Sequence, residues 1–96
     1  MKLVVINKLS EEKLAELQNA VPGSVVEAYK SPKEALPHVS DADAIALWGF
    51  QDIAPLLAAA PRVRWVHSLS DGVERLLTKE MMERPIILTN SHGVHD

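Results

Sequence analysis

The sequence predicts an α/β protein built on a five-stranded parallel sheet with helices on both faces. Short apolar runs rich in Val, Ile and Ala alternate with helix-start signals along the 96 residues. Unbroken apolar runs of this kind are typical of strands that are buried on both faces. Strand and helix alternating at this spacing indicate right-handed crossovers between parallel strands.

The first quarter of the predicted domain contains a strand over residues 3–6 and a helix that Ser10 caps. Leu14 and Leu17, with Val21, mark one apolar face of this helix, and Pro22 and Gly23 end it. A second strand is predicted over residues 25–29. Because Glu27 interrupts its apolar run, this strand suits the edge of the sheet.

Ser31, Pro32 and Glu34 form a capping-box start for the second helix. This helix must be short, because Pro37 disfavours helical geometry at the residue before it. A third strand follows over residues 44–48. Asp52 is predicted to cap the next helix, which runs to about residue 60.

The remaining predicted elements are a strand over 64–68, a short helix over 72–77, a helix that Thr78 caps and that runs through Met82, and a strand over 86–88. The arrangement expected is flavodoxin-like, with strand order 2-1-3-4-5. No fifth helix follows the last strand. We therefore expect residues 1–96 to be a single domain that is a fragment of a longer protein.

The composition excludes several kinds of site and makes several kinds of binding partner unexpected. With no cysteine, the chain cannot form disulfides or Cys-ligated metal sites. The net charge is −3, and acidic and basic residues are interspersed, so binding to nucleic acid or a membrane is not expected. The first apolar run is too short for a signal peptide or a membrane span, and a cytoplasmic protein is expected.

The loop after the fourth strand is the strongest candidate site. Ligands of open parallel sheets bind beyond the carboxyl ends of the strands. This loop leads into a helix start, where backbone N–H groups suit a small anion such as a carboxylate. Gly72 would allow close approach of the ligand to the backbone, although a tight turn alone also explains a glycine there.

Other chemistries lack the residues they need. The four glycines form neither a Gly-x-Gly-x-x-Gly motif nor a Walker A sequence, and Ser68 and Ser70 lack the frame of a nucleophile elbow. His92 and His95 are interpreted as part of a polar loop, without a metal site. His67 is interpreted as a packed or partly exposed side chain that does not act as a base.

The segment over residues 61–77, PRVRWVHSLSDGVERLL, resembles the substrate-domain signature of the D-isomer-specific 2-hydroxyacid dehydrogenases. That signature is a proline, a strand with an aromatic residue, and a Ser-x-x-x-Gly-Val-Asp-like turn. Residues 86–94 resemble the last strand of this family before its hinge, and residues 42–49 resemble its third strand. Two positions depart from the pattern: Glu74 replaces the frequent Asp, and Asp71 replaces a small or apolar residue.

This resemblance implies that the chain is the N-terminal part of the substrate-binding domain of a longer two-domain enzyme. Such enzymes transfer a hydride between NAD or NADP and a 2-hydroxy or 2-oxo acid, and the parent is expected to be a homodimer. The backbone N–H groups of Asp71 and Gly72, in the turn begun by Ser70, would bind the substrate carboxylate. Trp48 and Gly49 would line the same cleft.

The resemblance places the catalytic Arg, Glu and His and the cofactor-binding residues of the family outside this chain. We therefore assign no catalytic, cofactor or metal residue here and expect the chain to be inactive by itself. Two alternatives stay open. One is a free-standing flavodoxin-like module that binds a small carboxylate or a protein. The other is a structural fragment that dimerises through the surface left uncovered by its missing helix.

Overall fold

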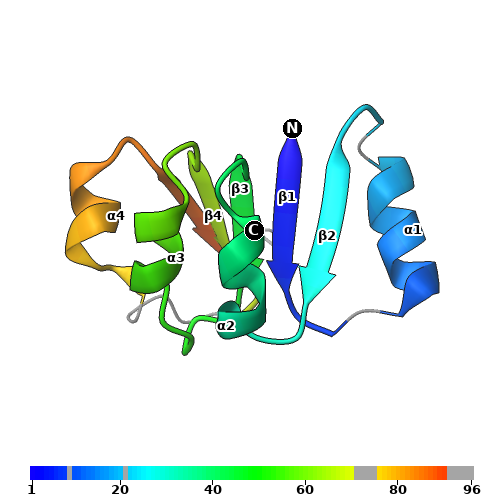
Figure 1. Cartoon of the computed structure of the whole chain (residues 1–96), viewed down its shortest axis with the longest axis horizontal. Coiled ribbons are helices and arrows are strands. Elements are labelled where there is room, and N and C mark those ends of the chain that lie inside the picture. Colours follow the sequence, from blue (N-terminus) through cyan, green and yellow to red (C-terminus); the bar gives the residue numbers. More distant parts are fainter. Residues whose placement is uncertain (9, 21, 71–75, 91–96) are drawn as a thin grey trace.

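The computed structural model describes residues 1–8, 10–20, 22–70 and 76–90, and these have the predicted α/β architecture. Their strands form one parallel sheet in the predicted order β2-β1-β3-β4-β5 (Figure 1). The strands are β1 (Lys2–Ile6), β2 (Val25–Tyr29), β3 (Ala44–Leu47), β4 (Trp65–Ser68) and β5 (Ile87–Asn90). The helices are α1 (Glu11–Ala20), α2 (Pro32–Ala35), α3 (Ala54–Ala59) and α4 (Lys79–Glu83), and a 3-10 turn, η1 (Leu36–His38), follows α2.

The predicted helix caps at Ser10, Ser31 and Thr78 are confirmed. Their hydroxyl oxygens accept hydrogen bonds from the N–H groups of Lys13 at 3.1 Å, Glu34 at 3.3 Å and Met81 at 3.4 Å. Each bond satisfies a donor that has no partner within its own helix.

Some details differ from the sequence-based expectation, besides shifts of one or two residues at several element ends. Glu34 accepts from the N–H of Lys30, one residue before the cap. The cap position of α3 is Ile53, and Asp52 Oδ1 accepts from the N–H of Ala54 at 3.1 Å. The last strand begins one residue later than predicted and runs to Asn90. The predicted helix over 72–77 lies mostly outside the described residues, as does Val21 of the first helix, so these predictions stay untested.

The two faces of the sheet carry cores of unequal size. The larger core packs alternate strand residues such as Val4, Ile45 and Val66 against α2, α3 and α4. The smaller core packs Val5, Val26 and Ala46 against the apolar side of α1. Since α1 covers the β2 side of its face, the side chains of β4 and β5 on that face are less covered, and Ile87 is 67% exposed.

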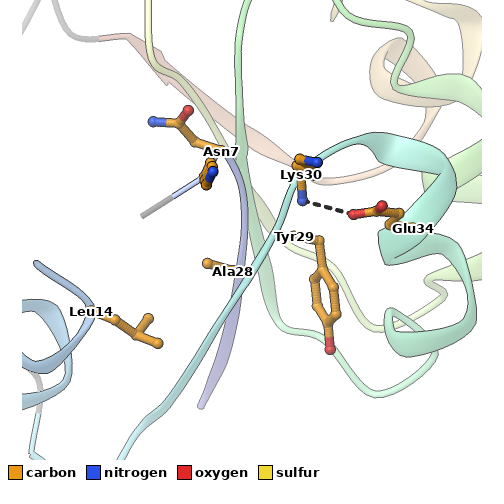
Figure 2. A pocket seen from close by; sticks show the side chains of 7 residues that line it. Asn7, Leu14, Ala28, Tyr29, Lys30 and Glu34 are labelled. Carbon is orange, nitrogen blue, oxygen red and sulfur yellow. Dashed lines mark hydrogen bonds between the residues drawn. The ribbon is translucent and has the colours of Figure 1, made fainter. Parts of the chain in front are cut away.

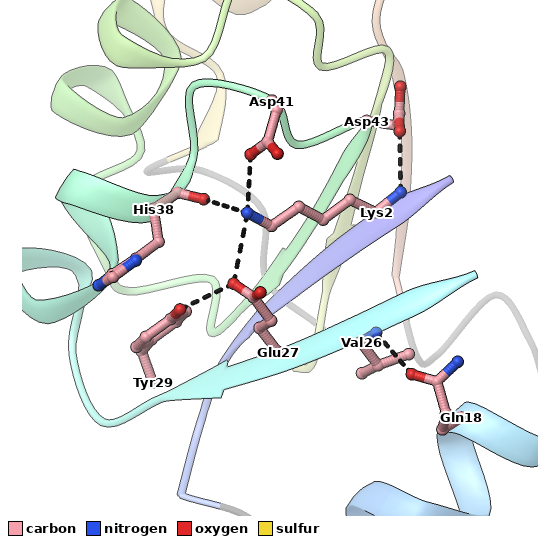
Figure 3. A network of polar contacts seen from close by, with 8 residues as sticks. All are labelled: Lys2, Gln18, Val26, Glu27, Tyr29, His38, Asp41 and Asp43. Atoms are coloured by element: carbon pink, nitrogen blue, oxygen red, sulfur yellow. Dashed lines mark hydrogen bonds and ion pairs between the residues drawn. The ribbon is translucent and has the colours of Figure 1, made fainter.

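A polar network holds the amino end of β1 in place (Figure 3). Lys2 Nζ lies 2.7 Å from Asp41 Oδ1 and 3.3 Å from Glu27 Oε1, and it donates to the carbonyl of His38 at 2.8 Å. Its hydrogen bond to Asp41 raises the pKa of Lys2 and lowers the pKa of Asp41. Tyr29 donates to Glu27 at 2.7 Å, and burial is the main reason why the Tyr29 pKa is raised. These charges therefore stabilise the amino edge of the sheet, opposite the candidate site.

Arg84 secures the end of α3. Its guanidinium donates to the carbonyl oxygens of Leu57 at 3.0 Å, Ala60 at 2.8 Å and Val63 at 3.1 Å. These carbonyls lie in the last turn of α3 and the segment after it, where intrahelical partners run out. One side chain thus links α4 to the entry of β4.

We expect Arg84→Met to lower the free energy of unfolding by about 1–3 kcal/mol, because part-buried carbonyls lose a charged donor. The exposed Arg64 offers a matched control, and Arg64→Met should change stability by no more than about 0.5 kcal/mol. Urea unfolding followed by circular dichroism measures both. Equal effects of the two substitutions would contradict a specific role for Arg84.

Candidate functional site

The carboxyl ends of β3 and β4 meet at one edge of the sheet. These neighbouring strands run parallel, with Leu47 opposite Ser68. The ladder continues one residue further, where the N–H of Leu69 donates to the carbonyl of Leu47 at 2.7 Å. The segments that follow the two strands therefore begin at the same level and next to each other.

Three of the predicted site residues, Trp48, Gly49 and Ser70, come together at this edge. The N–H of Gly49 donates to Ser70 Oγ at 3.0 Å, which joins two segments that are 21 positions apart in sequence. The predicted anion-binding residues Asp71 and Gly72 lie outside the described residues, as does Glu74. Their role stays a prediction.

The segment after β3 is a tight turn closed by Gln51. The side-chain oxygen of Gln51 accepts from the N–H of Trp48 at 2.9 Å, and its backbone N–H donates to the Trp48 carbonyl at 3.0 Å. The rings of Trp48 and Phe50 stack with centroids 6.4 Å apart, and Phe50 is 67% exposed. The aromatic pair therefore follows directly on β3, next to Gly49. Sequence reasoning missed Gln51, because glutamine is not one of the residues that mark turns.

Two hollows lie close to this edge. A groove of about 410 Å³ runs along the α1 face of the sheet, and its apolar lining includes Val5, Ala46 and Leu69. A second hollow, of about 270 Å³, lies at the carboxyl ends of β1 and β2 (Figure 2). Asn7 borders both of them. The lining of the second hollow includes the basic residues Lys8 and Lys30 and the apolar residues Leu14 and Ala28.

His67 is a packed, half-buried side chain, as predicted. Its Nδ1 lies 2.7 Å from the hydroxyl oxygen of Thr89, which also accepts from the indole N–H of Trp65 at 2.8 Å. Burial lowers the pKa of His67 below its ordinary value, because the charged imidazolium loses hydration there. The neutral ring is therefore the form that the fold favours.

The part of the chain that the structure describes contains no group of His, Cys, Asp or Glu residues that could hold a metal ion. His92 and His95 lie outside it. None of the described helices is long and apolar enough to cross a membrane.

No family model matches the sequence, and no curated protein gives a significant match. Among solved structures, the chain is similar to a D-isomer specific 2-hydroxyacid dehydrogenase family protein from Aeromonas salmonicida subsp. salmonicida A449. The TM-score is 0.71 and the sequence identity 23%, and the match covers 93% of this chain and 28% of the other. At this identity the match confirms the predicted fold. The chain spans about 28% of the length of that protein.

We expect the stability of the protein to fall as His67 becomes protonated. Since the folded-state pKa is depressed, the unfolded chain binds this proton more readily. The contribution of neutral His67 is complete above pH 6.5 and is lost as the pH falls through the folded-state value. Urea midpoints at about pH 7.5 and pH 5 should therefore differ more for the unmodified protein than for His67→Gln. The same pH dependence in both proteins would contradict this.

Proposed function

We propose that this chain forms the N-terminal part of the substrate-binding domain of an NAD- or NADP-dependent D-2-hydroxyacid dehydrogenase. Three observations support the proposal: the resemblance of residues 61–77 to the family signature, the shared fold, and the geometry of the carboxyl edge. The contact between Gly49 and Ser70 carries most weight, because it joins the two segments that the resemblance assigns to one substrate cleft.

In this proposal the loop after β4 binds the carboxylate of a small 2-oxo or 2-hydroxy acid through the N–H groups of Asp71 and Gly72. Gly49 and Trp48 line the cleft from the β3 side. The stacked pair of Trp48 and Phe50 offers an apolar surface to the carbon chain of the acid. Such a division between a polar head group and an apolar wall orients a small ligand.

The loop after β1 does not fit a dinucleotide. It reads Asn7, Lys8, Leu9 and Ser10, without the glycines that let a backbone approach a pyrophosphate. We therefore assign NAD or NADP, which accepts or supplies the hydride, to a second domain of the parent enzyme. A cytoplasmic location and a homodimeric parent belong to the same proposal.

A free-standing binding module is the second candidate. The exposed Phe50 and the apolar groove on the α1 face favour it, since exposed aromatic and apolar surface is typical of binding sites. A module of this kind would bind a small carboxylate or a protein and would transfer no hydride.

We expect pyruvate to bind this chain weakly, at millimolar concentration, and to shift the backbone amide resonances at Gly49 and Ser70. The physical reason is that the loop N–H groups recognise a carboxylate. A titration of ¹⁵N-labelled protein measures the binding, with pyruvamide, which lacks the charge, as the control. Equal shifts with both compounds, or shifts confined to Lys8 and Lys30, would overturn the proposed site.

We also expect no oxidation of NADH or NADPH when the 96 residues alone are mixed with glyoxylate or hydroxypyruvate. The chain holds no glycine-rich dinucleotide loop, so nothing would place a nicotinamide beside the bound acid. Absorbance at the NADH band follows the reaction. Steady turnover by the purified chain would show that the catalytic residues are present in it after all.

A further inference from the structure

Ser68, the last residue of β4, carries a hydroxyl group in an apolar environment. It is 0% exposed, and it shares one side of its strand with Val66, which belongs to the larger core. Burial of a hydroxyl costs free energy unless its hydrogen bonds are replaced within the protein. The role of Ser68 therefore follows from the groups to which its hydroxyl is hydrogen-bonded.

The Ser68 hydroxyl holds the main chain of Ser70 on both sides. Its Oγ donates to the Ser70 carbonyl at 2.9 Å and accepts from the Ser70 N–H at 3.3 Å. A serine hydroxyl has one donor and two acceptor positions, so it can make both bonds at once. The two contacts restrict the rotation of Ser70 relative to the end of β4.

Ser70 in turn restrains the loop after β3, which contains Gly49. Its own hydroxyl oxygen, 3.3 Å from that of Ser68, accepts the N–H of Gly49 at 3.0 Å. Ser68 is itself fixed opposite Leu47 by the pairing of β3 with β4. The bonds thus run from a buried strand residue to the first turn of the neighbouring loop.

We infer that Ser68 is a positioning residue of the substrate site, an inference that rests on the proposed function. It orients Ser70 so that the Ser70 hydroxyl holds Gly49, and the two loops then keep one relative position. A ligand that contacts both loops would lose less conformational freedom on binding when they are already fixed. Ser68 does not need to touch the ligand itself.

Selective labelling with ¹⁵N-glycine tests this coupling without any ligand. The chain has four glycines, so the spectrum contains at most four backbone amide signals. In Ser68→Ala, amide exchange at Gly49 should become about five- to tenfold faster, as in Ser70→Ala. The factor corresponds to the net contribution of one hydrogen bond, the one between Gly49 and Ser70 that a mobile Ser70 no longer keeps. Gly23 should be unchanged in both variants. Ser40→Ala, at an exposed serine, is the matched control and should leave Gly49 as it is.

Two further variants cover the case in which Ser68→Ala does not fold. Ser68→Cys has a similar shape but a weak donor, and it should also speed exchange at Gly49. Ser68→Thr keeps the hydroxyl and should restore the protection of Gly49. Unchanged exchange at Gly49 in a folded Ser68→Ala or Ser68→Cys would overturn the inference.

A pyruvate titration separates this inference from the proposed function. We expect Ser68→Ala to weaken pyruvate binding by about five- to tenfold, in step with the exchange at Gly49. If pyruvate bound both proteins equally, Ser68 would not position the site, and the inference would fall. If pyruvate bound neither protein while Gly49 still responded to Ser68→Ala, the proposed function would fall and the coupling of the loops would stand.

Discussion

The parallel pairing of β3 with β4 is the constraint on which the candidate site depends. With Leu47 opposite Ser68, both strands end at the same level, and the segments after them must lie side by side. Gly49 and Ser70 can then form a hydrogen bond although 21 positions separate them. A slip of one residue in this register would turn Ser68 to the opposite face and break that connection.

The two edges of the sheet are stabilised by different kinds of interaction. At the amino edge, Lys2 pairs with Glu27 and Asp41. At the carboxyl edge, the loops after β3 and β4 are held by neutral groups, among them the serine hydroxyls and the Gln51 amide. Neutral supports do not compete with a charged ligand for its partners. This difference agrees with the proposed binding of a small anion at the carboxyl edge.

Most of the fold could be predicted because its signals are local. The apolar runs and the cap residues Ser10, Ser31 and Thr78 lie within a few positions of the elements they define. Glu27 marked β2 as an edge strand, and the sheet order confirms it. The contacts of Arg84 with α3 could not be predicted, since they join residues that are more than 20 positions apart and follow no sequence spacing.

The sequence by itself determined the α/β class, the order of the elements and the residues near the candidate site, because periodicity and capping act over short distances. It also contained the motif around Ser68 and Ser70 but assigned Ser68 no role. Only the tertiary structure decided that Ser70, which the Ser68 hydroxyl holds locally, meets Gly49 of the neighbouring loop. The reason is physical: the bond between Gly49 and Ser70 depends on strand register, which exists only once β3 and β4 are paired.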